Sequence, residues 1–422
     1  MAEAYIIDAV RTPRGIGKVG KGSLATLHPQ QLAATVLRAI VDRNDLPTEK
    51  IDDVVWSTSA QRGKQGGDIG RMAALEAGFD VRVSGVTLDR FCGGGISSVA
   101  LAAGQVMGSL EDCVIAGGVE MMSFTAERDR DEFAAGLGAV LVGAGNPTLD
   151  ARHPQSHQGV CADAVASLEN ISREALDAFA AESQRRAAIA IEENRFARSL
   201  VAVTDSEGNL LLDREEFPRP STTAESLAQL KPAFETLIDH PYNEQGDTFR
   251  KQILRRYPDA DIKAVHHAGS SSGVVDGAAA LLLASGAFGR EQGLKPRARI
   301  VAAVNIGDDP TLMLNAPVPA ARKALERANL SIGDIDLWEI NEAFAVVPEK
   351  FIRDLGLDRS KVNVNGGAIA LGHPIGATGA ILIGTLVDEL ERTGGRYGLA
   401  TMCAAGGMAP AIIIERVSDY ID

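Results

Sequence analysis

Residues 84–118, SGVTLDRFCGGGISSVALAAGQVMGSLEDCVIAGG, contain the pattern that decides the fold of this chain. The pattern predicts a short strand at Ser84–Leu88, then Cys92 with three glycines after it, a helix of small residues at 96–107, and a strand from Cys113. Strands that alternate with helices in this way are typical of βαβ units in a layered α/β protein.

A weak internal repeat indicates two such units. In the second half, the strand-like segment 362–365 leads to His373, then a predicted helix at 376–391 and the strand-like segment 399–407. The reactive residue opens a helix both times, so two units that face each other would bring Cys92 and His373 together at helix N-termini. A helix N-terminus also favours the thiolate, so we expect a lowered pKa for Cys92.

The segments outside the repeat follow the same alternation, with one exception. Residues 122–271 are more polar, with a helix at 172–194 that Ser172 caps and a proline-rich stretch after it, which suggests an inserted lid. The other predicted elements are strands at 4–10, 52–59, 298–304 and Leu337–Ile340, and helices at 29–43, 277–283 and 318–328.

Composition narrows the function classes. The chain has 422 residues, which is too long for one ordinary core, and a net charge of −14, which argues against a nucleic-acid partner. Four cysteines without a CxxC pair favour neither a disulfide framework nor a zinc site, and they fit a reducing cytoplasm. We expect no signal peptide and no membrane insertion, because no apolar run approaches the ~20 residues that a span needs.

Neither a metal nor a nucleotide cofactor is expected. His153 and His157 are four residues apart and His266 is next to His267, but no further ligands are arranged around them. The segment GIGKVG at 15–20 matches GxGxxG, yet no helix follows it directly and no acidic residue lies at the expected distance.

Three glycine-flanked residues carry the chemistry: Cys92, His373 and Cys403. Two thiols and one imidazole suffice for covalent acyl transfer, since one thiol can hold an acyl group, the imidazole can activate it, and the second thiol can move a proton. Asn341 and Glu342 follow a predicted strand, where an amide and a carboxylate could hold a water or a substrate carbonyl; alternatively, Asn341 caps a helix.

Four ordered motifs resemble those of the thiolases, the group of acetyl-CoA acetyltransferases and 3-ketoacyl-CoA thiolases. They are CGGG at 92–95, NEAF at 341–344, GHPIGATG at 372–379, and Cys403 before Gly406-Gly407. The resemblance extends over nearly the whole chain. It implies an α/β fold with two similar βαβαβαββ halves in a five-layered α-β-α-β-α arrangement. The halves would be residues 1–121 with 272–296, and residues 297–422, with residues 122–271 as an inserted loop domain.

The resemblance also implies a mechanism. Cys92 would carry the acyl group, His373 would activate it, and Cys403 would move the proton at the α-carbon of the acetyl group. Asn341 would orient a water that forms, with His373, an oxyanion hole for the thioester enolate. A second oxyanion hole would use the backbone N–H groups of Cys92 and Ala405.

Coenzyme A is implied as a substrate, with no permanently bound cofactor. In the lid, Arg219, Ser226 and Ser272 match positions that line the coenzyme A site. His157 and Phe344 match positions near the reacting thioester. The expected partners are acyl-CoA and CoA, and the expected assembly is a homodimer or homotetramer.

The chain also departs from the family pattern. Ala405 replaces a usual glycine, which would strain the backbone if this position needs a positive φ. An additional segment at 235–263 carries a basic cluster of Arg250, Lys251, Arg255 and Arg256. This cluster is either a solvated helix face or an attraction site for the nucleotide phosphates of coenzyme A.

The expected reaction is thiolytic cleavage of a 3-ketoacyl-CoA or the reverse Claisen condensation. A decarboxylating ketoacyl synthase is the alternative within enzymes, but such enzymes present a Cys-His-His set. A non-catalytic CoA-binding protein is the alternative of another class, and it would be expected to have lost Cys92 or Cys403.

Overall fold

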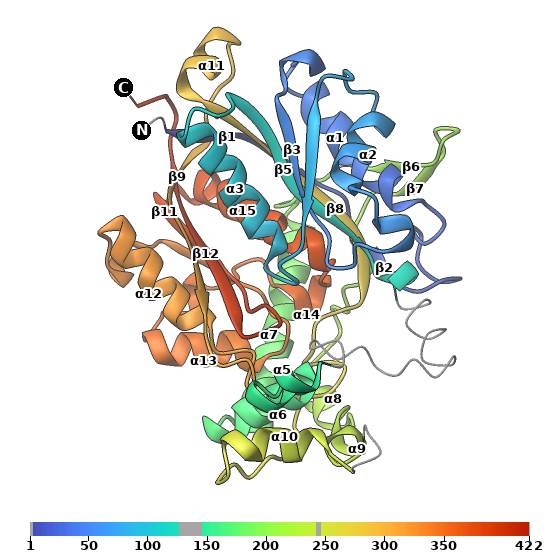
Figure 1. The fold of residues 1–422 in the computed structure, drawn as a ribbon, viewed down its shortest axis with the longest axis vertical. Helices are drawn as coiled ribbons and strands as arrows, with labels where there is room; N and C mark the ends of the chain where they lie inside the picture. The colour runs from blue at the N-terminus through green and yellow to red at the C-terminus, as the bar shows by residue number, and fades with distance from the viewer. Residues whose placement is uncertain (1–2, 126–145, 242–245, 422) are drawn as a thin grey trace.

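The computed structural model describes residues 3–125, 146–241 and 246–421, and its helices alternate with the two halves of one large sheet in five layers (Figure 1). The central layer holds α3 (Gly94–Met107) and α15 (Ile375–Thr393), which pack against each other and against strands of both halves of the sheet. The outer layers are α1 (Pro29–Asp42) with α2 (Ile69–Glu76) on one side, and α12 (Pro317–Ala328) with α13 (Val346–Leu355) on the other. The predicted five-layered arrangement is confirmed.

The strand order repeats between the two halves. In the first half of the sheet the strand order is β4 (Ser84–Leu88), β3 (Asp53–Ser57), β5 (Cys113–Met121), β8 (Val275–Ser285), β1 (Ala4–Arg11). A short strand, β2 (Gly15–Ile16), also pairs with β8. In the second half the order is β10 (Leu337–Ile340), β11 (Tyr397–Thr401), β12 (Met408–Arg416), β9 (Ala298–Gly307). β1 joins β9 through two residue pairs.

The second half has a reduced third strand. Where the first half has β4 beside β3, the strand predicted at 362–365 is only a bridge between Val362 and Trp338 of β10. The predicted βαβαβαββ order is otherwise present in both halves, with β8 and β12 as the closing antiparallel strands.

The helix predicted at 277–283 is wrong, because these residues belong to β8. Every residue of β8 is buried, and the strand lies between β1 and β5 in antiparallel register with both. A strand covered on both faces shows no alternation of apolar and polar residues, so its run of Ala and Leu resembles a buried helix. α11 (Gly286–Glu291) follows directly.

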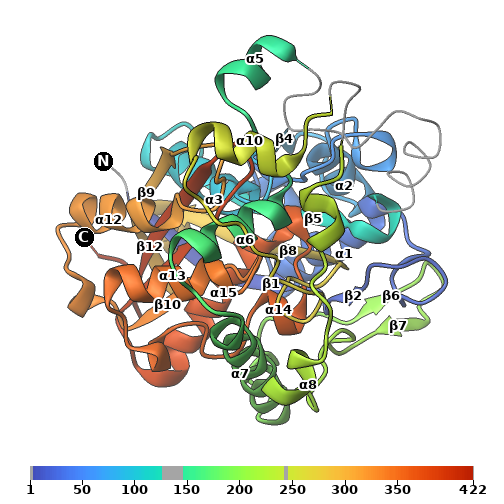
Figure 2. The same ribbon diagram turned by 90° about the horizontal axis from the view of Figure 1, so that it is seen from below.

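The lid consists mainly of helices that lie across one end of the sheets (Figure 2). Ser172 caps α7, as predicted, by accepting a hydrogen bond from the N–H of Ala175 at 3.3 Å. α6 contacts α10, which the additional segment supplies together with α9. The lid elements are α5 (Pro147–Arg152), α6 (Gln158–Leu168), α7 (Arg173–Glu192), β6 (Val203–Thr204), β7 (Leu210–Leu212), α8 (Ala224–Ala228), α9 (Glu235–Ile238) and α10 (Phe249–Arg256).

Two glycines allow the first turns of the central helices to touch. A Cβ atom on Gly379 of α15 would lie 2.1 Å from the backbone nitrogen of Ile96 in α3, and a Cβ on Gly95 would lie 2.8 Å from the nitrogen of Gly379. The helix starts that follow Cys92 and His373 are therefore in backbone contact, as the internal repeat predicted. Among the described helices, none has both the length and the apolar character of a membrane span.

Candidate active site

His373 lies just before α15, and its hydrogen bonds select one tautomer. The Nδ1 atom is 2.6 Å from Thr378 Oγ1, and the Thr378 hydroxyl donates to the backbone oxygen of Pro374 at 2.9 Å. Because that hydroxyl has a single proton, Thr378 must accept from His373 Nδ1–H. The lone pair therefore lies on Nε2, which is 3.4 Å from the side-chain nitrogen of Asn341.

The His373 side chain is also held in its neutral form. Burial, and secondarily the charge of Arg14, lower its pKa from 6.5 to about 4. At neutral pH the imidazole is unprotonated and can accept a proton, as a general base requires.

Cys92 precedes α3 after a residue with left-handed backbone, Phe91, whose φ is 48°. Burial, and then the carboxylate of Glu120, raise the pKa of Cys92 to about 12. The lowered pKa expected from the helix N-terminus is wrong, because desolvation of the thiolate outweighs the favourable backbone contribution. Cys92 is thus a thiol at neutral pH, and its activation requires a base.

The second thiol lies beside the first. Cys403 follows β11 and is 2% exposed, and burial, followed by the influence of Cys92, raises its pKa. The strain considered for Ala405 is not present. The left-handed positions of this loop are Gly406 and Gly407, with φ of 78° and 71°, and Ala405 has no positive φ.

Glu120 is a site residue that the sequence analysis missed. It is the penultimate residue of the buried strand β5, and its carboxylate accepts from the N–H of Gly376 in the first turn of α15 at 2.9 Å. It also accepts from Gln65 Nε2 at 2.7 Å and from the N–H of Ser59 at 2.9 Å. One carboxylate therefore joins the first half to the helix that follows His373, a contact with no local sequence signal.

The two polar residues of the NEAF motif point in different directions. Asn341 is 1% exposed and faces His373, and its Oδ1 has no hydrogen-bond partner among the described residues. That oxygen can serve a water or a polar atom of a substrate. Glu342 turns away from His373 toward α7, so it does not contact the reaction centre.

Three of the five residues assigned to substrate binding lie near the NEAF motif. The His157 ring is 5.5 Å from Phe234, whose ring is 6.0 Å from Phe344. The N–H of Ser272 donates to the oxygen of Ala343 at 2.9 Å. The other two lie on the lid surface: Arg219 is exposed and stacks on Phe217, and Ser226 is exposed and accepts from the N–H of Thr223, the N-cap residue of α8.

The basic cluster of the additional segment is engaged with local acceptors. Arg250 pairs with Asp239, Lys251 donates to the oxygen of Gly246, Arg255 pairs with Asp247, and Arg256 lies 3.5 Å from Asp309. These partners favour the interpretation of the cluster as a solvated, structural face.

α10 also braces the loop that packs on the Cys403 segment. The hydroxyl of Tyr257, directly after α10, is 2.5 Å from a carboxylate oxygen of Asp309, and the neighbouring Asp308 donates its N–H to Gly407. The adjacent histidines are structural as well, since His266 bonds Asp163 and His267 bonds Asp177 within the core. No group of three metal-ligating side chains occurs in residues 3–125, 146–241 and 246–421.

Known proteins are similar to this chain along nearly its whole length. The family model for the thiolase N-terminal domain matches residues 4–237, and that for the C-terminal domain matches residues 294–416. The chain belongs to the thiolase family. It is 37% identical to a beta-ketoadipyl-CoA thiolase of Acinetobacter baylyi, over 99% of this chain and 100% of the relative.

Two further thiolases are similar over their full lengths. A 3-oxoadipyl-CoA/3-oxo-5,6-dehydrosuberyl-CoA thiolase of Escherichia coli is 40% identical over 99% of this chain and 100% of its own. A steroid 3-ketoacyl-CoA thiolase of Mycobacterium tuberculosis is 38% identical over 99% and 95%. This thiolase is accordingly an acyl-CoA C-acyltransferase that uses coenzyme A as a substrate.

Proposed function

We propose that this thiolase cleaves 3-ketoacyl-CoA with CoA through an acyl thioester on Cys92. The observation that carries the proposal is the His373 side chain, which is neutral, with Nδ1–H committed to Thr378 and the Nε2 lone pair beside Asn341. A thiol with a pKa near 12 needs such a base.

The proposed steps balance in protons. His373 takes the Cys92 proton, the thiolate attacks the 3-keto carbon, and the bond between carbons 2 and 3 breaks to release the enolate of acetyl-CoA. The enolate oxygen rests on His373 and a water held by Asn341, and Cys403 protonates the enolate carbon. CoA then gives its thiol proton to Cys403 and attacks the acyl group, and Cys92 recovers its proton from His373.

Two backbone N–H groups complete the proposed site. The N–H groups of Cys92 and Ala405 would hold the oxyanion that forms when the Cys92 thiolate adds to the 3-keto carbon, and again when the CoA thiolate adds to the acyl carbon. His157, Phe344 and Ser272 would contact the thioester and pantetheine, and the exposed Arg219 and Ser226 would make the outer coenzyme A contacts.

The test compares variants of the two thiols. Cys92→Ser should abolish the CoA-dependent loss of 3-ketoacyl-CoA absorbance, whereas Cys403→Ala should abolish turnover yet still form acyl-Cys92 from acetyl-CoA. Mass spectrometry of the trapped wild-type enzyme should place the acyl group on Cys92. An acyl group on Cys113, Cys161 or Cys403 would refute the assignment.

The acyl group itself is addressed by a substrate panel. Straight-chain 3-ketoacyl-CoA thioesters of increasing length should be compared with 3-ketoadipyl-CoA, because two relatives carry names of dicarboxylic substrates. The thioester with the highest kcat/KM defines the substrate class.

We also propose a homo-oligomer, a cytoplasmic location and the three-part division at residues 121, 271 and 296. Among the residues that the structure describes, the edge strand β4 pairs only with β3, and Val86 on it is 45% exposed, which suits pairing with a second copy. All four cysteines are free, which fits a reducing compartment.

The proposed three-part division is supported by β8, in which the chain returns to the first half of the sheet after residues 122–271. Light scattering and limited proteolysis would test assembly and boundaries.

A further inference from the structure

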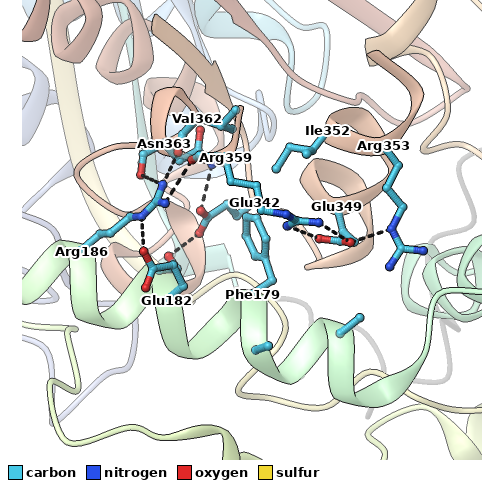
Figure 3. A pocket seen from close by; sticks show the side chains of 13 residues that line it. Phe179, Glu182, Arg186, Glu342, Glu349, Ile352, Arg353, Arg359, Val362 and Asn363 are labelled. Atoms are coloured by element: carbon cyan, nitrogen blue, oxygen red, sulfur yellow. Dashed lines mark hydrogen bonds and ion pairs between the residues drawn. The ribbon is translucent and has the colours of Figure 1, made fainter. Parts of the chain in front are cut away.

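A cavity of about 370 Å³ lies beside Glu342 of the NEAF motif (Figure 3). Its walls are α7, α13 and the segment at 359–363, with the apolar side chains of Phe179, Ile352 and Val362 facing the space. Glu342 forms its inner wall. Glu342, the residue after Asn341 in sequence, therefore borders this cavity.

The Glu342 carboxylate joins its own strand end to three other segments. Oε2 accepts from Ser183 Oγ of α7 at 2.6 Å and from the N–H of Ile369 at 3.1 Å, and Oε1 accepts from Asn363 Nδ2 at 2.9 Å. Ile369 belongs to α14 (Ala368–Leu371), which leads directly to His373. The side chain is fully buried, and among the described residues its hydrogen-bond partners are neutral.

Asn363 fixes the residue on the other side of Asn341. Its Oδ1 accepts from the N–H of Ile340 and its Nδ2 donates to the oxygen of Ile340, both at 2.8 Å. Asn341 is thus held between two anchored neighbours, Ile340 and Glu342, and both anchors share Asn363.

The backbone of Gly367 lies so close to the Glu342 carboxylate that the carboxylate has little room to move. A Cβ on Gly367 would lie 2.3 Å from the Glu342 carboxyl carbon, and the Gly367 N–H donates to Ser183 Oγ at 3.1 Å. The hydrogen bonds and this contact hold the carboxylate on one side, while the other side borders the cavity.

His373 has several anchors that do not involve Glu342, whereas Asn341 has one backbone bond of its own, from its N–H to the oxygen of Thr401 at 3.2 Å, and otherwise relies on its anchored neighbours. The His373 N–H donates to the oxygen of Gly273, its ring bonds Thr378, and Glu120 holds the next helical turn. Loss of the Glu342 bonds should therefore shift Asn341 relative to His373. Their contact is already long at 3.4 Å, so a small shift breaks it.

We propose that Glu342 is a positioning residue that fixes Asn341 against His373 by tying the end of β10 to the lid helix α7, and that it governs the carbon–carbon bond steps. The inference rests on the proposed function, in which Asn341 serves the enolate. Displacement of a reacting group by about 1 Å can cost up to about 100-fold in rate.

The experiment compares two reactions in Glu342→Ala, Glu342→Gln and Ser183→Ala. One is thiolysis of acetoacetyl-CoA, which requires the enolate; the other is transfer of acetyl from acetyl-CoA to Cys92, which does not. Glu349→Gln is the matched control. Glu349 lines the same cavity and is 2% exposed, but it pairs with Arg353 and Arg359 instead of the site.

We expect Glu342→Ala to lower kcat for thiolysis by roughly 10- to 100-fold, with acetylation of Cys92 within about twofold of wild type. Ser183→Ala should show the same selectivity with a smaller loss, Glu342→Gln should recover part of the rate, and Glu349→Gln should match wild type. Ser183→Ala keeps the test valid if Glu342→Ala does not fold.

Two results separate the possible failures. The positioning role would be overturned if a variant lost the same fraction of the rate in thiolysis and in acetylation of Cys92. It would also be overturned if Glu342→Ala and Ser183→Ala both kept the wild-type rate of thiolysis. A wild-type enzyme that forms no acyl-Cys92 would instead overturn the proposed function.

Discussion

Thr378 offers the most direct test of how the site activates Cys92. Thr378→Val keeps the shape of the side chain but removes the oxygen that accepts from His373 Nδ1–H at 2.6 Å. A buried donor without an acceptor costs about 1–3 kcal/mol. If that cost falls on the tautomer with a free Nε2, the base-competent population drops by roughly 5- to 150-fold.

The assay is the rate of Cys92 acetylation by acetyl-CoA, followed by rapid quench and mass spectrometry at pH 7. Thr378→Val should slow it within that range, and thiolysis should slow in parallel. Thr378→Ser keeps the hydroxyl and should stay within a few-fold of wild type. Urea unfolding of each variant separates lost stability from lost activity. Acetylation of the valine variant at the wild-type rate would show that Thr378 does not select the tautomer.

Three further predictions address other parts of the chain. Burial lowers the pKa of His373 from 6.5 to about 4, so the unfolded state binds the proton at higher pH than the folded state, and about 3 kcal/mol of stability is lost as the pH falls from 6.5 to 4. His373→Asn should remove that loss when the free energy of unfolding is measured in urea at each pH. The same pH dependence of the unfolding free energy in variant and wild type would contradict it. Tyr257→Phe should lower the free energy of unfolding by about 1–2 kcal/mol, since it removes a hydrogen bond to the Asp309 carboxylate; an unchanged urea midpoint would count against the brace. Replacing Arg255 and Arg256 by alanine should change the KM for CoA by less than about twofold, because both are exposed and paired; a large increase at low ionic strength would instead indicate attraction of phosphates.

The local sequence was sufficient where the deciding interactions are local. The bounds of β4 and β10 and the cap of α7 by Ser172 follow from short-range patterns of apolar residues and from one side chain that bonds its own helix. The glycine-flanked motifs predicted reactive roles for Cys92 and His373, because few other roles need a thiol or an imidazole among glycines.

Tertiary structure decided what depends on distant partners. The sequence of β8 resembles that of a helix, because a strand covered on both faces has no alternation of apolar and polar residues, and only its pairing with β1 and β5 shows that it is a strand. The pKa of Cys92 depends on burial and on Glu120, which no local motif reveals. Glu120 bonds Gly376 across 256 positions, and Glu342 bonds Ser183 across 159. Desolvation and long-range hydrogen bonds arise only when the chain is folded, so the sequence predicted the candidate reactive groups, while the folded chain sets their protonation and their hydrogen bonds.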